Sequence, residues 1–343
     1  MRKTIILSGL TVALSACGSG QPNVTASSPR LEATVEHVWD AGDGPGRGAA
    51  FSSDGRFLAT TAAGGDVIVR RAADWRVVRR LKHPGGATAV AFVPGSRSLF
   101  ASGYDGTVRA WNVGTGKAGG TLTDATGTLW TLDISPDGTM LAAAGEDGVA
   151  RLWSLAGREA PRALRGHSRN IWEVRFAPTG THLATASFDN TARIWDVASG
   201  KTLATLRGHS QAIVGLDYHP HGHLLATSGD DSTIRLWRTS DGEQRRKMEG
   251  GNHVYDVAFS PDGKWLASAG RARSVIGGFW YDVTGLGGSV SPVKLWRVAD
   301  GALVASLPHP TDVMYATFSP DGRYLVTSSE DSKVRLWRLA PRR

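Results

Sequence analysis

Four residue types recur in this chain in a grouping that would suit catalysis if it occurred once. His167, Thr185 and Asp189 supply an imidazole, a hydroxyl and a carboxylate, the kinds of group that form a catalytic triad. With a tryptophan, the grouping occurs three times: His167, Thr185, Asp189 and Trp195; His209, Thr227, Asp231 and Trp237; His309, Thr327, Asp331 and Trp337. Each histidine precedes its threonine by 18 residues, and each aspartate precedes its tryptophan by six. Because a catalytic triad occurs once, this recurrence indicates a structural hydrogen-bond network.

Three further histidines, His219, His221 and His223, alternate in the segment YHPHGHLL. Histidines at such spacing can hold a transition metal. The segment aligns, however, with Ser-Pro-Asp-Gly sequences that recur elsewhere in the chain as hairpin turns. The alignment favours a turn here, and no metal site is predicted.

The remaining sequence offers no enzyme motif. It has no GxSxG, HExxH or P-loop pattern and a single cysteine, so neither catalysis nor a cofactor is predicted. The formal net charge of +8 is spread along the chain. Its densest basic clusters are Arg76, Arg79, Arg80 and Lys82, and Arg245, Arg246 and Lys247. The simplest interpretation of these clusters is that they keep the protein soluble, since no nucleic-acid motif accompanies them. The alternative is that they bind a polyanion or polysaccharide, in which case binding would depend steeply on salt concentration.

The elements that must position these residues are short strands. In the stretch 166–207, runs of strand-like composition occur around Ile171–Phe176, Leu183–Ser187 and Ala192–Trp195. Pro-Thr-Gly and Asp-Asn sequences between the runs are turn formers. A fourth run, Leu203–Leu206, follows a Ser-Gly turn. The stretch therefore predicts a unit of four strands.

This unit repeats along the chain. Tryptophans mark it at a spacing of 42 residues in Trp111, Trp153, Trp195 and Trp237, and the series continues at Trp296 and Trp337. One period before Trp111 lies Arg70, in a strand-like run without tryptophan. The sequence therefore predicts seven units, six with tryptophan and one degenerate.

The complete unit begins with Gly166-His167 and ends with Trp195-Asp196, and in both respects it resembles the WD-repeat family. The resemblance covers about residues 33–339. It implies an all-β fold, a seven-bladed β-propeller of four-stranded antiparallel blades. It also implies that the aspartate, histidine and threonine of a complete unit form a buried hydrogen-bond chain that ends at the tryptophan indole.

The repeats set the expected blade boundaries within a propeller assigned to residues 31–343. The blades are expected at 43–82, 83–122, 123–165, 166–207, 208–249, 250–307 and 308–339, with an insert at 271–291. The last blade has only three strands of its own. We expect 33–39 to supply the fourth, so that the first and last parts of the chain join in one sheet and no edge stays free.

Residues 1–16 resemble a bacterial lipoprotein signal peptide. A basic start and a short apolar run lead to the sequence LSAC, which ends at Cys17 and resembles the lipoprotein cleavage box. We expect lipid on Cys17 and a flexible tether over 17–30, which is small and polar. The expected location is the cell envelope, with the outer membrane favoured in a Gram-negative host. An ordinary secretory leader is the alternative.

The resemblance implies one face of the ring for binding. The loops before the first strands and between the second and third strands meet there, around the channel. Ten residues are expected to lie at this face: Arg47, Tyr104, Trp130, Trp172, Phe188, Tyr255, Phe279, Trp280, Tyr281 and Met314. Exposed aromatic clusters mark partner sites. The alternative is that these side chains pack on adjacent blades and that the insert plugs the face.

These observations predict a monomeric, lipid-anchored scaffold that is not an enzyme and that binds proteins or peptides. An enzyme or small-ligand receptor using the channel is the alternative. It would require a cluster of acidic, histidine or metal-binding residues that occurs once, at the channel mouth. Only Glu146, Asp230 and Glu330 are expected there, on separate blades.

Overall fold

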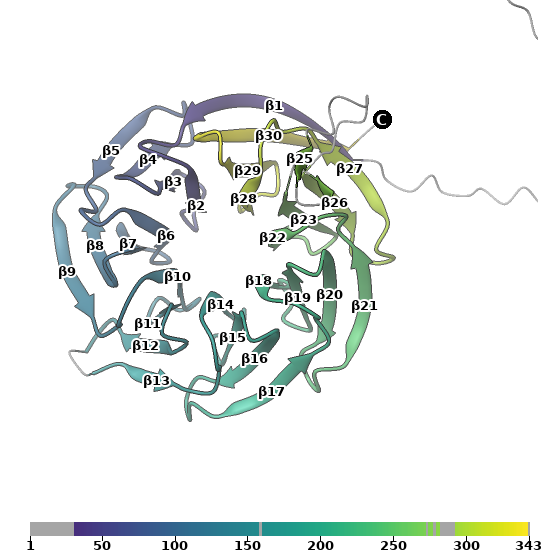
Figure 1. Cartoon of the computed structure of the whole chain (residues 1–343). Coiled ribbons are helices and arrows are strands. Elements are labelled where there is room, and N and C mark those ends of the chain that lie inside the picture. The colour runs from purple at the N-terminus through teal and green to yellow at the C-terminus, as the bar shows by residue number, and fades with distance from the viewer. Residues whose placement is uncertain (1–30, 158–159, 272–273, 277–278, 282–291, 342–343) are drawn as a thin grey trace, which may run out of the picture.

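The computed structural model describes residues 31–157, 160–271, 274–276, 279–281 and 292–341. Over these residues the chain forms seven four-stranded antiparallel sheets, arranged as blades in a ring around a central channel (Figure 1). The predicted all-β, seven-bladed propeller is confirmed. The predicted signal peptide, Cys17 and the tether lie outside the described residues.

The first four blades follow the chain from the channel to the rim. The first contains β2 (Gly46–Phe51), β3 (Phe57–Ala62), β4 (Val67–Arg71) and β5 (Val77–Leu81). The second contains β6 (Ala87–Phe92), β7 (Ser98–Gly103), β8 (Thr107–Asn112) and β9 (Ala118–Thr123). The third contains β10 (Leu129–Ile134), β11 (Met140–Gly145), β12 (Ala150–Ser154) and β13 (Arg162–Leu164). The fourth contains β14 (Ile171–Phe176), β15 (His182–Ser187), β16 (Thr191–Asp196) and β17 (Thr202–Arg207).

The last three blades include the insert and the closing strand. The fifth contains β18 (Ile213–Tyr218), β19 (Leu224–Gly229), β20 (Thr233–Arg238) and β21 (Gln244–Glu249). The sixth contains β22 (Val254–Phe259), β23 (Trp265–Gly270), β26 (Val293–Arg297) and β27 (Leu303–Leu307), and between β23 and β26 the hairpin of β24 (Ser274–Ile276) and β25 (Phe279–Tyr281). The seventh contains β28 (Val313–Phe318), β29 (Tyr324–Ser329), β30 (Lys333–Pro341) and β1 (Leu31–Asp40).

The ring is closed by β1, which pairs antiparallel with β30 along its length (Figure 1). The register places Leu31 opposite Pro341 and Asp40 opposite Lys333, with an irregularity between Val35 and His37. The predicted closure by the N-terminal strand is confirmed. Because β1 supplies the outer strand of the last blade, the unfolding of either end of the propeller must break this shared sheet.

The tryptophans of the third strands lie between blades. Trp195 is 2% exposed and packs in one cluster with Leu152 and Leu164 of the third blade and Ile171 of its own blade. Burial of such a side chain stabilises a fold by roughly 2–3 kcal/mol. A single sheet could not bury both its faces, so each blade depends on its neighbours.

The first blade has Arg70 where the others have tryptophan. Its guanidinium lies 4.9 Å from the ring centroid of Trp39 on the closing strand. Arg70 Nη2 donates to the carbonyl of Asp40 at 3.3 Å, and burial lowers the pKa of Arg70 to about 10, so it remains charged at neutral pH. Trp39 also packs against Trp75, at 5.6 Å between centroids. Arginine and two tryptophans thus connect the first blade to the closing strand.

Ser-Pro-Asp-Gly sequences form the turns between first and second strands. The Ser135 hydroxyl donates to Asp137 Oδ1 at 2.5 Å and accepts the N–H of Met140 at 2.9 Å. Gly138 adopts a φ of 72°, in the left-handed region that favours glycine. Serine, aspartate and glycine therefore satisfy the backbone of the turn locally.

Among the described residues, no helix has the length and apolar character needed to cross a lipid bilayer.

Candidate functional site

The recurring polar groups form hydrogen-bond chains within single blades. His167 Nδ1 lies 2.8 Å from Asp189 Oδ2, and its Nε2 lies 2.7 Å from the Thr185 hydroxyl. The indole N–H of Trp195 donates to that hydroxyl at 2.9 Å. Because the ionised carboxylate of Asp189 can only accept, His167 donates to it from Nδ1. The Nε2 of the neutral ring then accepts the Thr185 proton, and the Thr185 oxygen accepts the indole N–H. The order of donors fixes the histidine tautomer.

The fifth blade repeats this chain almost atom for atom. His209 lies 2.9 Å from Asp231 and 2.8 Å from Thr227, and Trp237 donates to Thr227 at 2.8 Å. Both histidine side chains are fully enclosed. Burial alone would raise the pKa of Asp231, but the hydrogen bonds from His209, Thr233 and the Ser210 N–H, together with the attraction of His209, outweigh it and hold the pKa well below its usual value. The groups are arranged to satisfy each other and leave no nucleophile facing solvent.

The seventh blade makes only part of the chain. His309 bonds Thr327 at 2.8 Å, and Trp337 donates to Thr327 at 3.0 Å. His309 Nδ1, however, faces the Leu307 carbonyl at 3.1 Å, and the prediction that Asp331 completes this chain is wrong.

Two local differences from the fourth blade accompany this loss, one a substitution and the other an ion pair. In the fourth blade, the N–H of Ser168, which follows the histidine, donates to Asp189 at 3.1 Å. The corresponding residue of the seventh blade is Pro310, which has no N–H to donate. Arg335 binds Asp331 instead, with Nη1 3.2 Å from Oδ1. Asp331 is thereby held away from the histidine.

The second blade has a histidine in place without its partners. His83 is 2% exposed, and among the described residues neither of its ring nitrogens has a hydrogen-bond partner. Its blade has Ala101 where the complete blades have threonine, and Asp105 binds Arg109 at 3.0 Å. Burial lowers the pKa of His83, so the ring stays neutral.

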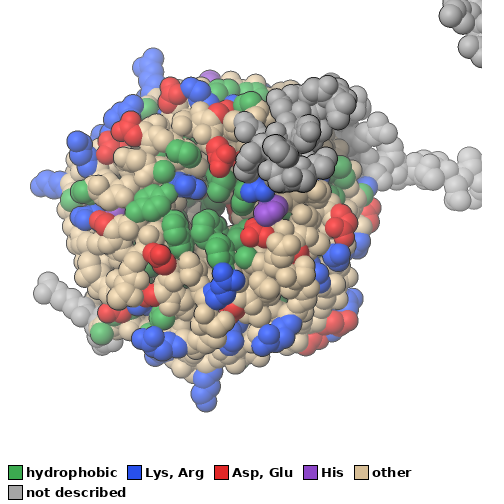
Figure 2. Space-filling model, in the orientation of Figure 1, with side chains coloured by type: hydrophobic (Ala, Val, Ile, Leu, Met, Phe, Trp, Pro, Cys, Tyr) green, Lys and Arg blue, Asp and Glu red, His purple; other side chains and the backbone are tan. Residues whose placement is uncertain are grey.

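Four predicted binding residues form a continuous aromatic row across the second, third and fourth blades. Tyr104 meets Trp130 edge-on with 5.7 Å between centroids, Trp130 stacks on Trp172 at 4.9 Å, and Trp172 stacks on Phe188 at 5.3 Å. All four are half-buried. We call them the aromatic ladder. Hydrophobic side chains gather around the hollow at the centre of this face (Figure 2).

Three other predicted residues line the channel but stand apart from the ladder. Arg47, Tyr255 and Met314 border a cavity of about 330 Å³ that Trp130 and Trp172 also line. The Tyr255 hydroxyl receives a hydrogen bond from Arg271 at 3.1 Å and lies 3.5 Å from Asp312. The remaining predicted residues, Phe279–Tyr281, form β25, and their side chains lie outside what the structure describes.

Below the ladder, the channel wall carries a charged group that the sequence interpretation missed. Its members come from the inner strands of five blades and all border the cavity: Asp133, Glu173, Arg175, Asp217, Asp256 and Tyr315. Arg175 forms an ion pair with Glu173 and donates to the Tyr315 hydroxyl at 3.0 Å. Four carboxylates therefore face a single arginine.

Three of these carboxylates bond the inner strand of the next blade. Asp133 Oδ2 accepts the N–H of Phe176 at 2.7 Å, and Asp217 Oδ2 accepts that of Phe259 at 2.7 Å. Asp256 accepts the N–H of Ala316 at 3.0 Å. Inner strands of adjacent blades belong to different sheets, so these N–H groups lack a strand partner. The carboxylates supply it and join the blades at the channel.

Burial shifts the titration of this group. It raises the pKa of Glu173 to about 7 and that of Asp217 to about 6, against the opposing attraction of Arg175. It also raises the pKa of Asp256 well above its usual value. Charged residues inside otherwise apolar strands, as in IWEVRF and IVGLDY, are the sequence feature that could have revealed the group.

Three cations of the basic clusters on the outer strands contact other groups of the propeller. Arg246 Nη2 of β21 donates to the carbonyl of Ala299 in the next blade at 3.0 Å, and Arg79 of β5 donates to that of Gly114. Lys247 pairs with Glu249 at 2.8 Å. These three cations have partners within the propeller.

Fold and site together define a seven-bladed propeller whose blades are braced by repeating polar chains and whose channel mouth is aromatic. The sequence profile of the WD domain, G-beta repeat family (WD40) matches residues 75–112, 116–154, 159–196, 200–238, 242–276 and 301–338. The chain therefore belongs to the WD40 family. Its degenerate first blade contributes only its outer strand to these matches.

One curated protein with a similar segment is a coronin-like protein of Saccharomyces cerevisiae (strain ATCC 204508 / S288c). The two chains are 45% identical over 47 residues, which is 14% of this chain and 7% of that protein. The chain thus spans a small part of the length of this relative. The similarity is about as long as one blade.

Proposed function

We propose that this protein is a non-enzymatic scaffold that binds a protein or peptide partner through the aromatic ladder. The observation that carries the proposal is the row of contacts at the channel mouth, in which Trp130 meets Tyr104 edge-on and stacks on Trp172, with Phe188 beyond. Tryptophan and tyrosine dominate the energetics of protein interfaces. Stacked rings are already ordered, so little side-chain entropy is lost when a partner binds.

The ladder defines the chemistry of the partner. It offers half-buried aromatic rings beside a cavity whose mouth includes Arg47. An apolar or aromatic side chain of the partner would pack on Trp130 and Trp172.

We further propose that Cys17 carries lipid and holds the propeller at a membrane of the bacterial envelope, because the residues before it match a lipoprotein signal. Incorporation of a labelled fatty acid in the wild type but not in Cys17→Ser would support the anchor, and equal labelling would refute it.

A ligand in the channel is the competing proposal, since carboxyl groups with raised pKa values are common in catalytic sites. The bonds of Asp133, Asp217 and Asp256 to neighbouring strands account for these groups structurally. We therefore place the function at the ladder. Turnover of hydrolase substrates by the wild type, lost in Asp217→Asn, would favour the channel.

Crosslinking and affinity capture from the native host test the ladder. A variant with Trp130, Trp172 and Phe188 replaced by alanine should lose partners that the wild type captures. Leu203→Ala is the matched control, because Leu203 is 55% exposed on the outer strand β17 and far from the channel. Identical partners for the wild type and the triple variant would remove the assignment of this face.

A further inference from the structure

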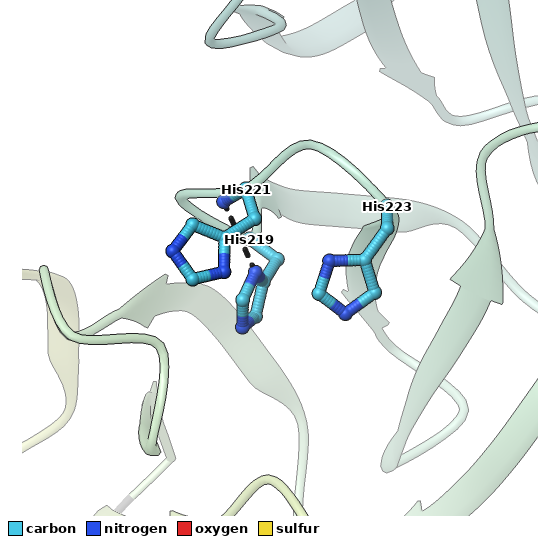
Figure 3. Close-up of side chains that lie close together, drawn as sticks. All are labelled: His219, His221 and His223. Carbon is cyan, nitrogen blue, oxygen red and sulfur yellow. Dashed lines mark hydrogen bonds between the residues drawn. The ribbon is translucent and has the colours of Figure 1, made fainter.

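Three histidines come together in the turn between β18 and β19. One ring nitrogen each of His219, His221 and His223 lies within 4.8 Å of the other two. The ring centroids of His219 and His223 are 4.2 Å apart, and those of His219 and His221 are 5.2 Å apart (Figure 3). The turn lies at the end of the blade opposite the ladder, one strand length of about 20 Å away.

This turn departs from the others at three positions. In the sixth blade the corresponding residues are Ser260, Asp262 and Lys264, where Ser260 donates to Asp262 at 2.6 Å and Lys264 lies 3.5 Å from Asp262. The seventh blade has serine, aspartate and arginine at these positions. These residues satisfy the turn by themselves. Histidine replaces all three in the fifth blade alone, so the turn does not explain them.

The hydrogen bonds of His219 leave its Nδ1 without a proton. The side chain is 6% exposed, and Nδ1 accepts the N–H of His221 at 3.1 Å, a hydrogen bond that a metal ion bound to Nδ1 would replace. Its Nε2 then donates to the Gly263 carbonyl at 3.2 Å. A carbonyl that receives the second N–H is the usual outer partner of a metal-bound histidine.

The other two rings are free to complete a site. His221 and His223 are exposed, and within the described residues no hydrogen bond to either ring is found. Nitrogens bound at 2.0–2.1 Å to one tetrahedral ion lie about 3.3 Å from each other. Rotation of two exposed side chains is sufficient to close the present separation of up to 4.8 Å.

We propose that His219, His221 and His223 bind one divalent transition-metal ion per chain, of the class of Zn²⁺, Ni²⁺ and Cu²⁺. Imidazole nitrogens select these ions over Mg²⁺ and Ca²⁺, which prefer oxygen ligands. Three neutral ligands on an exposed turn leave a coordination position open to solvent. This site is separate from the ladder, and neither proposal depends on the other.

Titration calorimetry of the metal-depleted full chain with Zn²⁺ tests the site. We expect one ion per chain, and affinity at least about tenfold lower in His221→Asn and in His223→Asn. Both residues are exposed, so the variants should melt like the wild type. Mg²⁺ should give no heat of binding.

His182→Gln is the matched control, because His182 is a single histidine at the same end of the neighbouring blade. It should bind Zn²⁺ as the wild type does, and so should Cys17→Ser, which removes the thiol as an alternative ligand. Absence of saturable Zn²⁺ binding would overturn the proposal. Equal affinity of the wild type and both asparagine variants would overturn it as well.

Discussion

Asp189 holds His167 in one tautomer and thereby orients the Thr185 hydroxyl toward it and the Trp195 indole toward Thr185. Asp189→Ala would leave a buried N–H of His167 without an acceptor. We expect this to lower the free energy of unfolding by about 2–3 kcal/mol. Chemical denaturation at pH 7 measures the change.

Asp189→Asn separates the hydrogen bond from the charge, because an amide oxygen can still accept from His167. We expect this variant to lose less stability than Asp189→Ala. The ionised carboxylate has a lowered pKa, so its share of the stability is present above about pH 4 and is lost as the pH falls below that value. Equal stability of the wild type and Asp189→Ala at pH 7 would contradict the network.

Asp217 should show the opposite pH dependence. Its pKa is about 6 in the folded protein and near 3.8 when unfolded, so the folded state holds the proton more tightly. Its contribution to stability therefore falls as the pH rises from about 4 to 6 and stays low above that.

Asp217→Asn keeps an oxygen for the N–H of Phe259 and removes the buried charge. We expect the variant to be more stable than the wild type by about 1–2 kcal/mol at pH 7.5 and nearly equal at pH 4, measured by denaturation at both values. A stability difference that does not change between the two pH values would show that the buried charge of Asp217 does not destabilise the fold.

For individual residues, a structural role can be predicted from the sequence when the same residue types recur from blade to blade. The chains of His167 and His209 could be predicted because their spacing repeats. The failure at Asp331 depends on the missing N–H of Pro310 and the reach of Arg335, which spacing alone does not show. The channel carboxylates were missed because each of their two register positions is acidic in only two of the seven blades, and because three of them bond across blades.

At the scale of elements, β1 completes the last blade and contacts the first. Trp39 packs against Trp75 and beneath Arg70, so it joins the closing strand to the first blade. We expect Trp39→Ala to lower the stability by about 2 kcal/mol, less than for a fully buried tryptophan. Faster amide exchange in β1 and β30 should accompany the loss, measured by hydrogen–deuterium exchange.

Leu203→Ala on the exposed outer strand β17 is the control, with an expected change within about 0.5 kcal/mol. Unchanged exchange in β30 of Trp39→Ala would show that this contact does not hold the closure.

The strands and the closure were predictable, because alternation and a missing fourth strand are visible in the sequence. The use of Arg70 at a tryptophan position was not, since its partners, Trp39 and Asp40, lie about 30 residues earlier.

At the scale of the whole molecule, different parts of the ring have different roles. Carboxylates at the channel and arginines at the rim, such as Asp217 and Arg246, join blade to blade. The aromatic ladder lies at one face and the three histidines at the other. A rigid ring with two separate surfaces suits a scaffold, because binding at one surface need not reshape the other.

The affinity of the captured partner for the purified propeller tests the ladder most directly. Calorimetry at low and high salt should show binding that Trp172→Ala weakens at least about tenfold, that Leu203→Ala leaves unchanged, and that salt affects little. Affinity that is insensitive to Trp172→Ala, or that falls steeply with salt, would contradict the account.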